Sequence, residues 1–209
     1  MEQAKVESTA PGERYVIERP RLTRMLDESN ARIILLVAPA GYGKTTLARQ
    51  WFARGDKRVA WYRAQPASAD VAALADGIAR TASVLIPGAR SLMLRHLQSS
   101  GDHGPETLAD ALAAHLQSWP EGAWLAVDDY EYILNSDASE LFFEHLVDAT
   151  PLHLLVASRR RPPWATGRRI LYGELYEIGR SALTLAQEEA RHVLAGVPAE
   201  DAEELIAHS

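Results

Sequence analysis

The sequence predicts an α/β fold in which a parallel β-sheet is covered by helices on both faces. Two observations predict this class. Short apolar runs that are continuous rather than alternating recur along the chain, and this pattern is typical of strands buried on both faces. Segments with apolar residues at helical spacing separate these runs, and such alternation favours right-handed crossover connections within one open sheet.

The expected elements follow one another in a regular order. The apolar runs predict strands at 33–38, 58–62, 123–128, 153–157 and 175–178. Helical periodicity predicts helices at 45–54, 71–85, 108–116 and 141–147. The segment 86–105 is rich in Gly, Ser and His, so we expect it to form a long loop between the second and third strands.

After the fifth predicted strand the pattern is helical only. Thr184 and Gln187 have the spacing of a capping box, and the helix that they begin is expected to end at Gly196. A second, acidic helix is predicted after Pro198. Because the chain ends within this amphipathic pattern, we expect it to be part of a longer protein.

Composition narrows the possible classes of protein. The 209 residues include 22 Lys and Arg against 28 Asp and Glu, and the net charge of -6 argues against nucleic-acid binding by bulk electrostatics. No cysteine is present, which excludes disulfides and thiolate metal sites and favours a reducing compartment. The longest apolar stretch is far shorter than the roughly 20 residues of a membrane helix. We therefore expect a cytoplasmic protein that does not span a membrane.

The most informative motif follows the first predicted strand and reads Ala38-Pro39-Ala40-Gly41-Tyr42-Gly43-Lys44-Thr45-Thr46. A strand, a glycine-containing loop and a helix in this order are the context of a P-loop. The glycines allow backbone N–H groups to converge on a phosphate, and the helix N-terminus adds positive potential. Lys44 is expected to reach the β- and γ-phosphates, Thr45 to bind Mg²⁺, and Thr46 to contact the α-phosphate. The strict pattern has Gly where this chain has Ala38.

Two carboxylates end the third predicted strand. A P-loop nucleotidase needs an acidic residue at the end of a parallel strand to hold Mg²⁺. We assign Asp128 to Mg²⁺ and Asp129 to positioning or deprotonating the attacking water, because successive side chains point in different directions. The alternative interpretation is a pair of carboxylates that begins a turn.

The fourth predicted strand ends in Ser158-Arg159. A polar residue at this strand end would face the γ-phosphate, so Arg159 is a candidate sensor of bound triphosphate. Two alternatives remain for the arginine run 159–161. It could be a solvated loop stiffened by Pro162 and Pro163, or a local nucleic-acid patch that the overall charge disfavours.

Several short motifs follow one another in a fixed order along the chain. They are RPRL at 19–22, APAGYGKTT followed by Trp51, VAW at 59–61, LAVDDY at 125–130, LLVASR at 154–159, and YEI followed by LTLAQEEA at 183–190. This order resembles the nucleotide-binding domain of MalT-like, LuxR-type transcriptional regulators, and the resemblance covers nearly the whole chain. These regulators belong to the signal-transducing ATPases with numerous domains (STAND), which are relatives of the NB-ARC and AAA+ ATPases.

The resemblance implies a five-stranded sheet of order 5-1-4-3-2 followed by a small helical subdomain. We accordingly expect an N-terminal tail at 1–17, a P-loop nucleotide-binding domain at 18–180, and the start of a helical subdomain at 181–209. Family members are switches: ADP holds a closed monomer, whereas ATP with an inducer opens the protein and drives self-association. DNA is bound by a separate domain, which is absent from this chain.

The family also implies roles for individual residues. Arg19 and Arg21 would lie against the adenine and ribose. Lys44 and Thr45 would bind phosphate and Mg²⁺, and Asp128 and Asp129 would bind the metal and the attacking water. Arg159 would sense the triphosphate. Together these roles imply slow Mg²⁺-dependent ATP hydrolysis.

Two departures from the family pattern concern hydrolysis and the inducer. Glu131 stands where the family usually has His, and Arg63-Ala64-Gln65-Pro66 replaces an acidic segment. The alternatives to a switch domain are a freestanding P-loop kinase or AAA+-type ATPase, and a degenerate nucleotide-binding module. The inducer is not identified by the sequence.

Overall fold

The computed structural model describes residues 17–55, 57–99, 101, 103–187 and 189. The chain divides into two compact units. One comprises Pro20–Thr184, and the other combines Met1–Arg19 with Leu185–Ser209. Only a few residues of the second unit are described, and the account below concerns Pro20–Thr184 unless stated otherwise.

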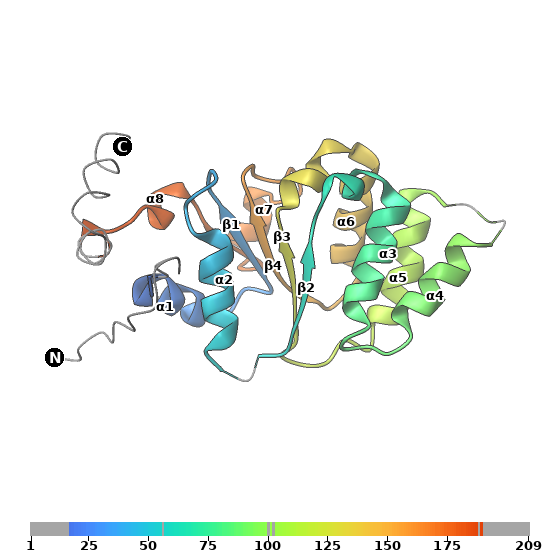
Figure 1. Ribbon diagram of the computed structural model, residues 1–209, viewed down its shortest axis with the longest axis horizontal. Helices are drawn as coiled ribbons and strands as arrows, with labels where there is room; N and C mark the ends of the chain where they lie inside the picture. The colour runs from blue at the N-terminus through green and yellow to red at the C-terminus, as the bar shows by residue number, and fades with distance from the viewer. Residues whose placement is uncertain (1–16, 56, 100, 102, 188, 190–209) are drawn as a thin grey trace, which may run out of the picture. The chain divides into compact units, whose positions relative to one another are not determined.

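Five parallel strands form the centre of the larger unit (Figure 1). They are β1 Ile33–Val37, β2 Val59–Arg63, β3 Trp124–Asp128, β4 His153–Ser158 and β5 Leu175–Ile178. Their order is β2-β3-β4-β1-β5, which is the predicted order 5-1-4-3-2 read from the other edge. The five predicted strands and their arrangement are thus confirmed, with bounds that shift by one residue at most.

Helices connect successive strands. The α-helices are α1 Pro20–Glu28, α2 Lys44–Ala53, α3 Val71–Ala82, α4 Ala89–Leu97, α5 Pro105–Leu116, α6 Asp137–Ala149, α7 Gly167–Leu171 and α8 Arg180–Leu183. Two 3₁₀ segments, η1 Pro66–Ala69 and η2 Tyr130–Asn135, follow β2 and β3. The four helices predicted from periodicity correspond to α2, α3, α5 and α6.

The sheet is buried on both faces, as the continuous apolar runs predict. On one face, Ile34 and Leu36 of β1 pack in a cluster with residues of α1 and α2. On the other face, Ile33 and Leu35 join a larger cluster with residues of α3, α5 and α6. Figure 1 shows α1 and α2 on one side of the sheet and α3, α5 and α6 on the other. Alternate residues of one strand therefore serve two separate cores.

The predicted loop at 86–105 is wrong, because this segment contains α4. Gly88 takes a left-handed conformation (φ 91°) at the start of this helix, and Ala89 and Met93 are fully buried against the larger core cluster. Figure 1 shows α4 on the outer side of α3 and α5, away from the sheet. Tertiary burial of two apolar side chains thus outweighs the loop-like composition around them.

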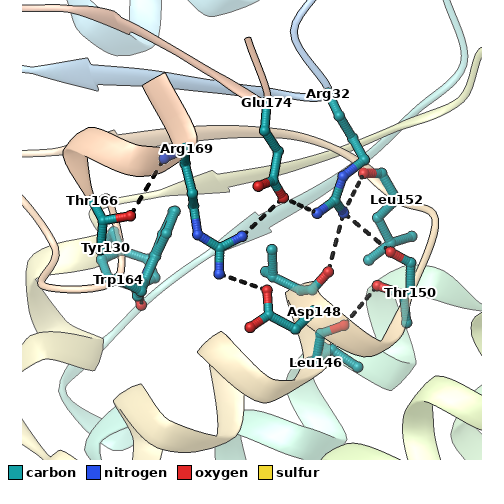
Figure 2. A network of polar contacts seen from close by, with 11 residues as sticks. Arg32, Tyr130, Leu146, Asp148, Thr150, Leu152, Trp164, Thr166, Arg169 and Glu174 are labelled. Carbon is teal, nitrogen blue, oxygen red and sulfur yellow. Dashed lines mark hydrogen bonds and ion pairs between the residues drawn. The ribbon is translucent and has the colours of Figure 1, made fainter. Parts of the chain in front are cut away.

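Arg32 organises the amino-terminal edge of the sheet (Figure 2). Its Nη1 donates to the main-chain carbonyls of Val147, Thr150 and Leu152 at 3.0, 3.1 and 3.3 Å, which satisfies groups that the end of α6 leaves without helical partners. Its Nη2 lies 2.6 Å from Glu174 Oε1. The start of β1 is thereby linked to the end of α6 and the approach to β5.

The predicted helix at 184–196 and the acidic helix after Pro198 fall largely outside the described residues, so the helical subdomain and the three-region division stay predictions. Among the residues that the structure describes, no helix combines the length and the apolar character needed to cross a membrane.

Candidate functional site

The P-loop connects the carboxyl end of β1 to the start of α2. Gly41 and Gly43 have positive φ values of 86° and 75°, a backbone conformation that side chains with a Cβ rarely adopt. Gly43 is the N-cap of α2 and offers no side-chain cap. The first N–H groups of α2 therefore face the loop at the positive end of the helix dipole, as an anion site requires.

The other predicted loop residues surround this turn. Pro39, Ala40 and Thr46 are exposed, and Ala38 is buried at the end of the strand. Ala38 N donates to Ser158 O at 3.3 Å, so the loop leaves the sheet beside the end of β4. This placement puts the loop next to the strand that carries Arg159.

Lys44 folds back over the P-loop. Its Nζ donates to Ala38 O at 2.6 Å and to Pro39 O at 2.9 Å. Burial lowers the pKa of Lys44 from its ordinary value. The charge of Glu131 makes the largest opposing contribution and raises this pKa. The ammonium therefore lies among several carboxylates at the end of the sheet, and it is positioned by main-chain carbonyls rather than by one fixed ion pair.

Thr45 and Asp128 come together although they are far apart in the sequence. Thr45 Oγ1 donates to Asp128 Oδ1 at 3.0 Å. Asp128 is only 4% exposed, and burial raises the pKa of its carboxyl, partly offset by the hydrogen bond from Thr45. A buried carboxylate beside a hydroxyl is a fitting donor pair for Mg²⁺, which keeps several waters and takes its other ligands from phosphates.

The part of the chain that the structure describes holds no cluster of three or more His, Cys, Asp or Glu side chains suited to a metal ion.

Asp129 has an unusual backbone and an unforeseen partner. Among the described residues it is the only one other than glycine with positive φ, at 55°. This left-handed turn ends β3 and begins η2. The Oδ2 of Asp129 lies 2.8 Å from Nε of Arg63, which ends β2. The candidate for activating water is therefore paired with an arginine of the neighbouring strand.

Arg159 lies directly after β4 and pairs with Glu131. The Nε of Arg159 is 2.7 Å from Glu131 Oε1, and the main-chain N of Arg159 donates to Glu131 Oε2 at 3.2 Å. Its neighbours also have partners, since Arg160 donates to Asn135 Oδ1 at 3.1 Å and Arg161 Nε lies 2.7 Å from Glu177 Oε2. Each of these three arginines is thus paired with a residue of η2 or β5.

Tyr42 links the P-loop to α8. The Nε of Arg180 donates to the Tyr42 hydroxyl at 3.0 Å, and its guanidinium lies 5.7 Å from the centre of the Tyr42 ring. Sequence reasoning singled out Tyr42 only as a loop residue and did not identify Arg180. No local signal marks this contact, because the two residues are 138 positions apart.

The two arginines expected near adenine make polar contacts of their own. Arg21, on α1, donates from Nη2 to the carbonyls of Ala182 and Thr184 at 2.8 and 3.4 Å. Arg19 belongs to the second unit, where its Nη2 lies 3.0 Å from Glu189 Oε2. A role for either arginine in holding the nucleoside stays a prediction.

Comparisons with known proteins agree with this geometry. A family described as an AAA domain matches residues 26–160. The HTH-type transcriptional regulator MalT of Cronobacter sakazakii is 31% identical over 189 residues, and MalT of Vibrio cholerae is 30% identical over 191 residues. These alignments cover 86% and 87% of this chain but 20% of each relative. The chain thus spans about a fifth of the length of these curated relatives.

Solved structures share the fold. A STAND protein with a tetratricopeptide repeat sensor from Pyrococcus horikoshii has a TM-score of 0.56 at 17% identity, covering 93% of this chain and 29% of that one. A Walker-type ATPase of Pyrococcus abyssi has a TM-score of 0.55 at 16% identity, covering 92% of this chain and 63% of that one. The P-loop geometry, the strand order and the family match agree: the chain belongs to the AAA domain family and is a P-loop NTPase domain similar to the MalT transcriptional regulators.

Proposed function

We propose that this chain is the ATP- and ADP-binding switch domain of a STAND-type transcriptional regulator, in which slow Mg²⁺-dependent ATP hydrolysis controls opening and self-association. The single observation that carries the proposal is the hydrogen bond of 3.0 Å between Thr45 and Asp128 beside the P-loop. It brings the hydroxyl and the carboxylate of a magnesium nucleotide site to one point. The similarity to MalT supports the regulatory context.

Each residue of the site has a distinct task in this proposal. The N–H groups of the loop from Gly41 to Lys44 bind the β-phosphate, and Lys44 leaves the carbonyls of Ala38 and Pro39 to reach the β- and γ-phosphates. Mg²⁺, when bound, neutralises developing charge on the phosphates. Thr45 and Asp128 would hold it, and Asp129 orients the attacking water.

The wider function extends beyond this chain. Self-association in the ATP state, response to an inducer and DNA binding through another domain come from the resemblance to STAND regulators, as do the adenine contacts of Arg19 and Arg21 and the cytoplasmic location. The arginines that follow Arg159 favour the switch over a freestanding kinase. Arg160 and Arg161 pair with Asn135 and Glu177, whereas a kinase lid needs arginines free to close on a substrate.

The test is to measure ADP and Mg²⁺-ATP binding by isothermal titration calorimetry in the wild-type chain and the Lys44→Ala variant. Loss of the charge-assisted contact to phosphate is expected to weaken binding by about 10- to 100-fold. The matched control is Lys57→Ala, because Lys57 contacts Asp27 and the ring of Trp51 instead of the P-loop. Equal affinities in the wild type and Lys44→Ala would refute the proposal.

A further inference from the structure

Glu131 acts on both cations that are expected to contact the γ-phosphate, Lys44 and Arg159. It belongs to η2, directly after the left-handed turn at Asp129. Its side chain is 13% exposed, whereas that of Arg159 is 54% exposed. The carboxylate contacts both the guanidinium and the main-chain N of Arg159, at 2.7 and 3.2 Å. Glu131 is therefore the carboxylate partner of Arg159.

The same carboxylate acts on the P-loop lysine. Among the charges around Lys44, that of Glu131 has the largest effect in raising its pKa, ahead of Asp128 and Asp129. Lys44 itself is hydrogen-bonded to the carbonyls of Ala38 and Pro39. Glu131 is thus close enough to both Lys44 and Arg159 for its charge to influence each of them.

Electrostatics then distinguishes between nucleotides. A γ-phosphate bound by Lys44 and Arg159 must approach the partly buried carboxylate of Glu131, which is also negatively charged. The phosphate must also replace this carboxylate as the partner of Arg159. A nucleoside diphosphate ends before this point and meets Glu131 only at longer range. Repulsion from Glu131 therefore weakens the binding of the triphosphate more than that of the diphosphate.

We propose that Glu131 is a specificity-determining residue that takes the place of the γ-phosphate on Arg159 and thereby shifts the preference of the site from triphosphate toward diphosphate. The inference rests on the proposed nucleotide function and deepens it. In this arrangement Asp128 and Asp129 serve the metal and the water, while the third carboxylate of the same segment sets the balance between the two nucleotides.

The experiment compares dissociation constants for ADP and for a non-hydrolysable ATP analogue, both with Mg²⁺, by isothermal titration calorimetry. In Glu131→Gln the side chain keeps an oxygen that accepts from Arg159 N but loses its charge. The ratio of analogue affinity to ADP affinity is expected to rise by about tenfold. Glu131→Ala should show a rise of similar size, because it also lacks the charge.

The matched control is Glu177→Gln. Glu177 forms an ion pair of the same length, 2.7 Å, with Arg161, and it lies on β5 beyond β1. This variant loses one carboxylate and one arginine pair as Glu131→Gln does, and its nucleotide ratio is expected to stay within about twofold of the wild-type ratio.

Two results would overturn the inference. One is a ratio in Glu131→Gln that stays within about twofold of the wild-type ratio. The other is a Glu131→Gln variant that behaves as wild type while Glu131→Ala loses affinity for both nucleotides, which is the pattern of a purely structural contact. Failure of the wild-type chain to bind ADP at all would instead refute the proposed function, so the two failures are distinguishable.

Discussion

Asp129 carries the most unusual backbone conformation of the site. Its φ of 55° and ψ of 39° lie in the left-handed region, where most residues with a Cβ pay about 1–2 kcal/mol and only Gly, Asn and Asp are common. After the turn, Glu131 contacts Arg159 at the end of β4, and the Asp129 carboxylate lies beside Arg63. The carboxylates of Asp128, Asp129 and Glu131 thus have different partners although they are close in sequence.

Two substitutions at Asp129 separate conformation from chemistry. Asp129→Asn is expected to keep the left-handed turn, the stability and nucleotide binding, but to lower ATP turnover because an amide cannot accept a proton from water. Asp129→Ala should lower turnover and also cost about 1 kcal/mol of stability from the backbone alone. Phosphate-release assays and urea denaturation measure the two effects. Equal turnover in wild type and Asp129→Asn would remove Asp129 from this role.

The residues of the P-loop could be predicted from the sequence because their chemistry is contained in one contiguous segment. Their partners could not. The contact between Arg63 and Asp129 depends on β2 lying next to β3, and the contact between Tyr42 and Arg180 joins residues 138 positions apart. The position of Asp128 at the end of β3 beside the loop could be predicted, because the carboxyl ends of parallel strands share one edge of the sheet. The pairings between side chains at that edge can be identified only from the three-dimensional structure.

At the scale of elements, the length of a helix or strand affects whether its apolar period can be recognised in the sequence. The five strands and the helices α2, α3, α5 and α6 carry enough apolar residues to show a period, and they were predicted. The helices α7 and α8 contain five and four residues, about one turn each, which is too short for periodicity to appear. The helix α1 was missed although Pro20 at its first position is a helix-start signal.

The helix α3 packs so closely against β2 at Gly77 that a larger side chain would not fit there. Gly77 lies within α3, where glycine costs about 1 kcal/mol relative to alanine. A Cβ at this position would lie 2.7 Å from Cε2 of Tyr62 on β2, and the Tyr62 hydroxyl is fixed by a hydrogen bond of 2.7 Å with Ser68 Oγ. The helix can therefore approach the sheet this closely only because residue 77 is glycine.

Gly77→Ala is accordingly expected to lower the free energy of unfolding by about 1–3 kcal/mol despite the better helix propensity of alanine. Urea denaturation measures the change. The control is Gly167→Ala, where a Cβ has no neighbour within 4 Å and the expected change is under about 0.5 kcal/mol. In a Tyr62→Leu background the penalty of Gly77→Ala should shrink. An unchanged or increased stability of Gly77→Ala in the wild-type background would contradict this account.

At the scale of the whole molecule, an ion network at the amino-terminal ends of the strands, opposite the P-loop, joins α6 and α7 to the residues that precede β1 and β5. Glu174 Oε1 lies 2.6 Å from Arg32 and 2.9 Å from Arg169, and Arg169 also pairs with Asp148 of α6 (Figure 2). Burial alone would raise the pKa of Glu174, but the hydrogen bonds and charges of the two arginines outweigh it and hold the pKa below its ordinary value.

This shift makes the contribution of Glu174 dependent on pH. A depressed pKa in the folded state means that the stabilisation is complete above the ordinary glutamate pKa of about 4.3 and is lost as pH falls through the lower folded value. Wild type should therefore be more stable than Glu174→Gln at pH 7, and the difference should shrink on acidification below about pH 4. Urea denaturation across this range measures it.

The control at pH 7 is Glu121→Gln, which changes an exposed carboxylate and is expected to alter stability by less than about 0.5 kcal/mol. A stability difference between wild type and Glu174→Gln that grows toward acid pH would show that the carboxylate of Glu174 is not stabilised by its arginines.

The strand order also has a consequence for how the protein is made. β1 leaves the ribosome before β4 and β5, yet these two strands are its neighbours, with Ile33 opposite Leu154 and Leu175. Because a domain forms as a unit while synthesis proceeds at about 5–20 residues per second, the P-loop waits for most of the domain to be translated before its strand has a partner. A nascent chain that stops before β4 carries every residue of the P-loop and has no assembled site to present to a nucleotide.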